Sequence, residues 1–161
     1  MGLNFDPGRT TYSSSESEGG YNAKLGFLLT QGTGLGNYTS ASTSYVDVDA
    51  TNLTGKVIIP VGWVAVLSGS GVLGVNTLSA VVGVGLADAG TLLQEQKVQP
   101  SISGASSQIG FGLSWVLKGD NKGHSFSLQF KTTNAADSVV LFNDSALHVP
   151  TLIIELGPSN F

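Results

Sequence analysis

The sequence lacks cysteine and is poor in charge. Without cysteine the chain can form no disulfide framework, no thiolate metal site and no cysteine nucleophile. Charged residues make up 11% of the chain, against about 25% in a typical soluble domain. The polar residues are therefore mainly Ser, Thr, Asn and Gln, which suit turns, strand edges and subunit contacts. These absences favour a protein that assembles with other subunits over a freely soluble enzyme.

The chain also lacks an excess of basic residues. It carries 7 Lys and Arg residues and 11 Asp and Glu residues, which gives a formal net charge of −4. Proteins that bind nucleic acid neutralise phosphates with clustered Lys and Arg side chains. We therefore expect no nucleic-acid partner.

Long uninterrupted apolar runs are missing as well. Residues 57–87 contain no charged residue and are long enough to cross a bilayer, but Pro60, Asn76 and several glycines and serines interrupt them. Their apolar stretches are short and rich in valine, which is typical of buried strands. Residues 1–20 hold one basic residue, Arg9, and no apolar segment, so they predict no signal peptide. We expect no membrane partner.

The first 40 residues differ in composition from the rest. Residues 10–20 are mostly Ser, Thr, Gly and Glu, and residues 31–37 form a Gly-rich connector. Segments with so few apolar side chains cannot bury a core of their own. We divide the chain into an extended, low-complexity anchoring arm, residues 1–40, and a β-sandwich domain, residues 41–161. The candidate anchors of the arm are its larger apolar side chains: Phe5, Tyr12, Tyr21, Leu25, Phe27 and Leu28.

From residue 44 onward, apolar residues recur at every second position. Strands with one face in a core have this period of two. No segment has a convincing helical period, although residues 91–96 could form one helical turn. The pattern predicts strands at residues 45–49, 55–59, 63–68, 80–86, 92–98, 109–117, 125–131, 138–142 and 151–156.

Turn residues separate these strands. Residues 118–123 are rich in Gly, Asp and Asn and predict a hairpin loop, and residues 134–137 predict another connection. Many short strands at this spacing favour a sandwich or a jelly roll. The predicted fold is all-β, a jelly-roll β-sandwich with an extended N-terminal arm.

One glycine string matches a known fingerprint. Residues 69–74 read Gly-Ser-Gly-Val-Leu-Gly, the spacing of dinucleotide-binding loops. That chemistry needs a helix directly afterwards, whose N-terminus faces the pyrophosphate. The following residues are rich in β-branched side chains and contain no charge, so we predict a glycine hairpin between strands and no cofactor.

The candidate titratable residues are few. His124 and His148 are the only histidines, and Asp120 and Asp144 each precede one of them by four residues. Each histidine could therefore pair with the aspartate that precedes it, but a metal site needs more ligands grouped closely. We favour ordinary surface or interface histidines. The sequence predicts no metal site and no catalytic residue.

Two aspartates on one predicted strand have a simpler interpretation than calcium binding. Asp47 and Asp49 alternate with Val46 and Val48, so the carboxylates should lie on the solvent face.

The large side chains of two alternating strands are the candidate core or trimer contacts. Because they recur at every second position, they should share one face of each strand. They are Phe111, Trp115, Phe126, Leu128 and Phe130.

Four stretches together resemble a known class. Residues 44–49 and 59–63 are similar to the opening strands of small jelly-roll domains in tailed-bacteriophage structural proteins. Residues 123–132, with a hydrophobic-Gln-hydrophobic-Lys pattern, and residues 150–155, Pro-Thr-Leu-Ile-Ile-Glu, resemble their final strands. The wider architecture resembles the trimeric tumour-necrosis-factor/C1q-like sandwich. The resemblance covers roughly residues 44–157.

This resemblance implies a virion protein without enzymatic activity. It would be made in the bacterial host cytoplasm and then lie on the capsid surface, as a homotrimeric decoration or cement protein. Its partners would be its own copies and the major capsid protein or another virion protein, bound through the arm. Two alternatives stay open: a tail-fibre or receptor-binding tip that recognises a host glycan or protein, and a small hydrolase or lectin outside any virus.

Overall fold

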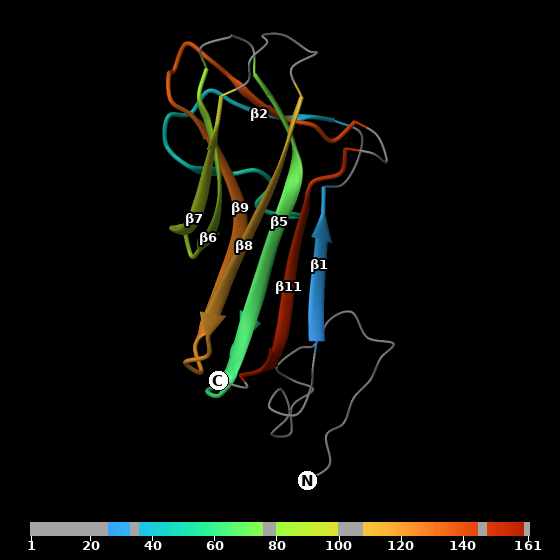
Figure 1. The fold of residues 1–161 in the computed structure, drawn as a ribbon, viewed down its shortest axis with the longest axis vertical. Helices are drawn as coiled ribbons and strands as arrows, with labels where there is room; N and C mark the ends of the chain where they lie inside the picture. The colour runs from blue at the N-terminus through green and yellow to red at the C-terminus, as the bar shows by residue number, and fades with distance from the viewer. Residues whose placement is uncertain (1–25, 33–35, 76–79, 100–107, 145–147, 160–161) are drawn as a thin grey trace.

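The computed structural model describes residues 26–32, 36–75, 80–99, 108–144 and 148–159, with side chains from Gln31 onward. These residues form two antiparallel sheets packed face to face (Figure 1). The larger sheet contains β1 (Gly26–Gln31), β2 (Tyr38–Ser40), β5 (Trp63–Val75), β8 (Ile109–Lys118), β10 (Val139–Leu141) and β11 (Thr151–Pro158). The smaller sheet contains β3 (Val46–Asp47), β4 (Thr54–Ile58), β6 (Val82–Asp88), β7 (Thr91–Val98) and β9 (Gly123–Thr132). The described residues contain no helix, and so none that could cross a membrane.

Strand β5 is the centre of the larger sheet. One of its edges pairs with β8, and its other edge pairs first with β11 and then with β10. Strand β1 lies beyond β11, and β2 lies beyond β10. In the smaller sheet the order is β7, β6 and β9, and the far edge of β9 pairs with both β4 and β3.

The chain passes repeatedly from one sheet to the other. It runs from β4 in the smaller sheet to β5 in the larger, returns for β6 and β7, and crosses again at β8 and at β9. A jelly roll distributes its strands in this way. The prediction of an all-β sandwich is therefore confirmed. Strands β1 and β2 lie before residue 44, in a part of the chain for which the alternation predicted no strand.

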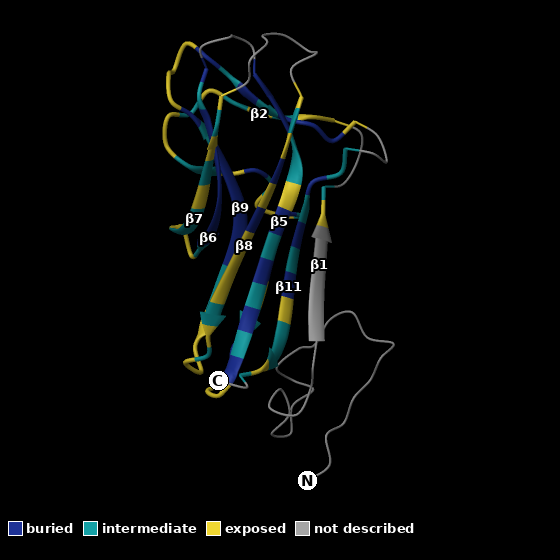
Figure 2. Ribbon diagram, in the orientation of Figure 1, coloured by how far each residue is buried: buried dark blue, intermediate teal, exposed yellow. Residues whose placement is uncertain are grey.

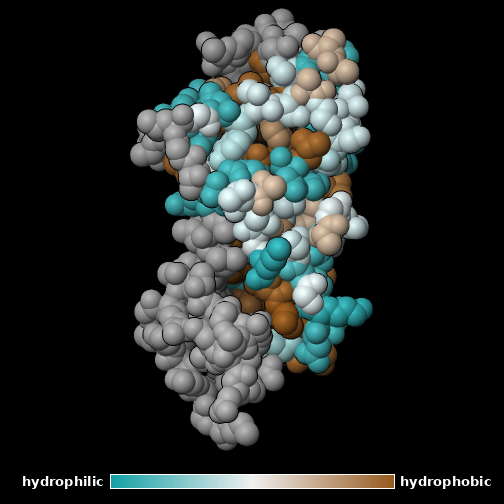
Figure 3. Space-filling view, turned by 180° about the vertical axis from the view of Figure 1, so that it is seen from behind, coloured by the Kyte–Doolittle hydropathy of each residue, from teal (hydrophilic) through white to brown (hydrophobic). Residues whose placement is uncertain are grey.

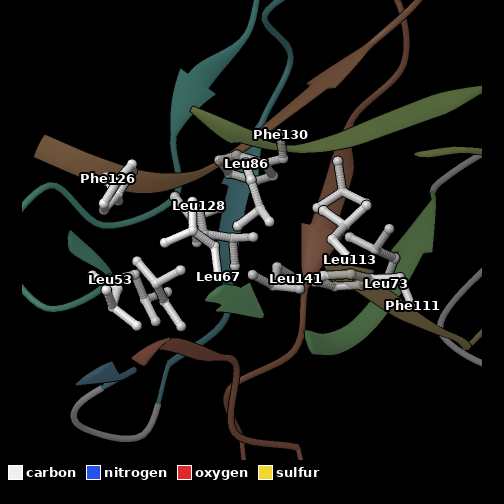
Figure 4. Packing of buried hydrophobic residues seen from close by; sticks show 14 of the residues in the cluster. Leu53, Leu67, Leu73, Leu86, Phe111, Leu113, Phe126, Leu128, Phe130 and Leu141 are labelled. Atoms are coloured by element: carbon white, nitrogen blue, oxygen red, sulfur yellow. The ribbon is translucent and has the colours of Figure 1, made fainter. Parts of the chain in front are cut away.

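The core lies between the two sheets. Burial alternates along β5 and β11, so that every second side chain faces inward (Figure 2). Leu67 and Leu128 are fully buried and come from opposite sheets, and Figure 4 shows these core side chains pointing toward one another. Fully burying each such side chain stabilises the fold by about 1.5–3 kcal/mol.

The glycines of residues 69–74 lie inside β5, so the predicted hairpin is wrong. A Cβ on Gly69 would lie 3.1 Å from Leu128 Cδ1 and 3.1 Å from Leu86 Cδ2, both from the smaller sheet. A Cβ on Gly71 would lie 2.9 Å from the Phe111 ring. Glycine is present here because large side chains lie against the backbone: they come from the opposite sheet at Gly69 and from the neighbouring strand β8 at Gly71.

The loop at residues 118–123 is also not the predicted hairpin, because β8 and β9 belong to different sheets. The loop instead bonds to the β4–β5 turn: the Gly119 amide donates to the Trp63 carbonyl at 2.8 Å, and the Asn121 amide donates to the Ile59 carbonyl at 3.0 Å. The composition of residues 118–123 therefore predicts the position of the turn, but it does not predict which sheet each flanking strand joins. Residues 91–96, where one helical turn was possible, lie in β7.

Candidate functional site

The outer face of the larger sheet is almost free of charge. Side chains of β5, β8 and β11 that point away from the core are mainly Val, Ser, Gly and Thr. Among the described outward-facing side chains of these three strands, those of Lys118 and Glu155 are charged. The members are Val64, Val66, Ser68, Ser70, Val72, Gly110, Gly112, Ser114, Val116, Lys118, Thr151, Ile153, Glu155 and Gly157. We call this surface the small-residue face.

The register shows how flat the centre of this face is. Ser70 pairs with Gly112 on one side and with Thr151 on the other, and the Ser70 and Thr151 hydroxyls lie 2.7 Å apart. Two rows away, Val66 pairs with Val116, which is 54% exposed, on one side and with Glu155 on the other. The side chains in the Ser70 row are small, so another flat surface can approach the backbone closely there.

The outer face of the smaller sheet is different. The Tyr45 hydroxyl donates to Glu95 Oε2 at 2.9 Å, and Lys131 Nζ lies 4.4 Å from the centre of the Tyr45 ring. Lys97 forms an ion pair with Glu95 at 3.2 Å. The view from behind shows hydrophilic residues together with hydrophobic patches (Figure 3). Charge is therefore distributed unevenly between the two outer faces.

The predicted contact residues fall into two groups. Phe111, Phe126, Leu128 and Phe130 are buried in the core between the sheets. Trp115 is 38% exposed, because β8 pairs only with β5 among the described strands and so lies at the edge of the sheet.

The predicted arm anchors are described only in part. Phe27 and Leu28 lie in β1, opposite Glu155 and Ile154 of β11, and their side chains are not described. The other predicted anchors lie outside the described residues: Phe5, Tyr12, Tyr21 and Leu25.

Both histidines contact the aspartate four residues before them. His124 Nε2 lies 3.1 Å from Asp120 Oδ1, and His148 Nδ1 lies 2.7 Å from Asp144 Oδ1. His124 has a second carboxylate: its Nδ1 lies 2.6 Å from Asp88 Oδ2. The spacing in the sequence allowed the first two pairs but did not predict the contact with Asp88. Asp88 is distant along the chain and reaches His124 only because β6 pairs with β9.

The cluster of Asp88, Asp120 and His124 is an ion-pair and hydrogen-bond cluster. Both ring nitrogens of His124 are occupied by carboxylates. Within the described part of the chain, no group of three or more His, Asp or Glu side chains is arranged to hold a metal ion.

Hydrogen bonds from neighbouring residues hold the two aspartates at the end of β3. Asp47 is exposed, and its Oδ1 accepts hydrogen bonds from Ser127 Oγ at 2.7 Å and Gln129 Nε2 at 2.9 Å. Asp49 accepts a hydrogen bond from the Tyr38 hydroxyl at 2.9 Å and others from the backbone that follows it. Each carboxylate is thus engaged by protein donors.

No protein-family model matches this chain, and no curated protein matches it.

Proposed function

We propose that this chain is a non-enzymatic structural protein of a tailed-phage virion, a homotrimeric decoration or cement protein that stabilises the capsid lattice. The observation that carries the proposal is the small-residue face, whose side chains are mostly small and uncharged. The distribution of the strands over two sheets supports it as well, because the trimeric tumour-necrosis-factor/C1q-like sandwiches that the sequence resembles are jelly rolls.

The small-residue face favours another copy of the same chain as its occupant. The cores of protein interfaces are depleted in charged residues, because stripping water from a charge is costly. Copies of a chain with a net charge of −4 repel one another, and contact through an uncharged surface keeps like charges from being placed close together. A standard interface buries roughly 800 Å² on each partner, and strands of 13, 10 and 8 residues in β5, β8 and β11 provide a continuous surface for it.

The proposed role of residues 1–40 is to anchor this trimer to the capsid shell. Strand β1 begins at Gly26, opposite Leu156 of β11. An anchor that leaves from this sheet edge would bind a neighbouring capsid subunit, and the tether would raise the effective concentration of every further contact.

Deletion of residues 1–25 tests the anchoring role. The deletion stops before Gly26 because β1 pairs with β11 along its full length, and its removal would expose a new sheet edge. The truncated protein should stay a soluble trimer and no longer bind undecorated capsids in a sedimentation assay. Full decoration by the truncated protein would show that residues 1–25 are not the anchor.

A receptor-binding tip is the second candidate function. It is favoured by Val61, which is 67% exposed on the turn between β4 and β5, beside the loop that follows β8. Exposed apolar residues on loops at one end of a sandwich can contact a host surface. A glycan array and a cell-binding assay separate the two functions, because a capsid decoration protein should bind neither target.

A further inference from the structure

His124 is placed so that each of its ring nitrogens faces a carboxylate. Nδ1 lies 2.6 Å from Asp88 Oδ2, and Nε2 lies 3.1 Å from Asp120 Oδ1. A neutral imidazole has one N–H group and can donate to only one of them. The other ring nitrogen would then set its lone pair against a carboxylate oxygen. Only the protonated ring, which donates from both nitrogens, satisfies the observed geometry.

The three residues come from three separate parts of the fold. Asp88 ends β6, His124 lies near the start of β9, and Asp120 lies in the loop that crosses from β8 to β9. Asp88 Oδ1 also accepts a hydrogen bond from the Ser125 amide at 3.0 Å. The His124 ring stacks on the Phe126 ring, with centroids 5.6 Å apart and an angle of 3° between the planes. The ring is thus held in one orientation.

Hydrogen bonds connect the crossing loop to a neighbouring turn. The amides of Gly119 and Asn121 donate to carbonyls on either side of the β4–β5 turn, and Asn121 Oδ1 accepts a hydrogen bond from the Val61 amide at 3.0 Å. The loop that carries Asp120 therefore also holds the turn that exposes Val61.

Few other charges face the histidine. Lys122 lies 3.7 Å from Asp120 and is mostly exposed. On β4, Val57 is the register partner of His124, and Lys56 pairs with Ser125, on the opposite side of the strand. The carboxylates of Asp88 and Asp120 are thus the charges that contact the ring among the described residues.

We propose that Asp88, His124 and Asp120 form a pH-sensitive latch that fastens the crossing loop to the end of β6 when His124 is protonated. Loss of the ring proton removes one of the two hydrogen bonds and leaves two carboxylates beside a neutral ring. The crossing loop and the β4–β5 turn then loosen together. The latch does not depend on the function proposed above.

The direction of the linkage follows from the surroundings of the ring. Burial lowers the pKa of His124, but the hydrogen bonds and charges of Asp88 and Asp120 outweigh burial, so the pKa is raised above its ordinary value of 6.5. A raised folded-state pKa means that the protonated ring stabilises the fold. This contribution is complete below pH 6.5 and is lost as the pH rises through the raised pKa.

Two measurements on the full chain test the latch. NMR titration of the imidazole protons should give His124 a midpoint above the ordinary value, and Asp120→Asn should lower that midpoint. Amide hydrogen exchange should show that the protection factors of Gly119 and Asn121 fall about fivefold from mildly acidic to mildly alkaline pH, which corresponds to the loss of about one hydrogen bond.

His148→Gln is the matched control, because His148 contacts a single carboxylate and should leave these protection factors unchanged. His124→Gln should abolish their pH dependence, and Asp120→Asn provides the same test if His124→Gln does not fold. A His124 midpoint at or below the ordinary value overturns the latch. Protection factors in the unmodified chain that do not change with pH overturn it as well.

Discussion

The hydroxyl of Tyr45 occupies the space where any other residue at position 83 would carry its Cβ, so the ring lies directly across Gly83. Gly83→Ala should displace the ring and break the hydrogen bond from Tyr45 to Glu95. We expect a loss of about 1–3 kcal/mol in the free energy of unfolding, as for other over-packed sites. Urea denaturation followed by fluorescence measures it.

Gly123→Ala is the control for this substitution. Gly123 begins β9 in the same sheet as Gly83, and nothing lies within 4 Å of a Cβ built on it, so alanine should be neutral or slightly stabilising there. An equal loss at both positions would show that the Tyr45 contact is not the cause.

The small-residue face can be tested without disturbing the fold of one chain. Gly112→Arg places a long charged side chain in the middle of this face, where the single chain has open space. The variant should stay folded, because a side chain at position 112 meets open space in the single chain, but it should no longer associate, because the charge would have to be desolvated in the contact. Light scattering coupled to size-exclusion chromatography should report the 16.5 kDa chain mass for the variant and three times that mass for the unmodified protein.

Gly123→Arg is the matched control for association. Gly123 is also exposed and has open space around it, but it begins β9 in the other sheet. The Gly123→Arg variant should therefore remain a trimer. If Gly112→Arg also remains a trimer, the subunits do not meet through the small-residue face.

The alternation of the sequence predicted the strands well because one face of each strand is buried. Phe126 and Leu128 lie in the core as a period of two requires. Alternation carries no information on pairing, however. For that reason it could not show that β5 continues through Gly69 and Gly71, or that β8 and β9 belong to different sheets.

The polar clusters were predictable only where the partners are close in sequence. The four-residue spacing indicated that Asp120 and Asp144 could meet the two histidines, and both contacts are present. Asp88 meets His124 through the register of β6 and β9, and Tyr45 meets Glu95 through the packing of a loop on the smaller sheet. Such long-range contacts have no local signal.

Asp49 should make the fold sensitive to acid. Burial raises the pKa of its carboxyl, but hydrogen bonds from Asn52, Thr51 and Tyr38 outweigh burial and lower the pKa from 3.8 to about 2. A lowered folded-state pKa stabilises the fold at pH values above 3.8, and this stability is lost as the pH falls toward 2. Asp49→Ala should therefore cost about 1–2 kcal/mol at neutral pH and much less near the lower pKa.

Denaturation midpoints of the two proteins across the acidic range measure this difference. A constant difference at every pH would mean that the charge of the Asp49 carboxylate does not contribute, and that the loss comes from packing alone.

The β6–β7 turn offers a stabilising substitution. Ala89 and Gly90 have φ angles of 46° and 81°, and Asp88 pairs with Thr91, so the two residues form a hairpin turn with both central residues in the left-handed region. Alanine is strained there by roughly 1 kcal/mol, because its Cβ crowds the following carbonyl. Ala89→Gly and Ala89→Asn should relieve this strain, and Asn should gain more because glycine also increases the freedom of the unfolded chain. Thermal denaturation should show a higher melting temperature for both variants, with Ala89→Asn the higher. A lower melting temperature for Ala89→Asn would mean that the turn does not hold residue 89 in the left-handed region.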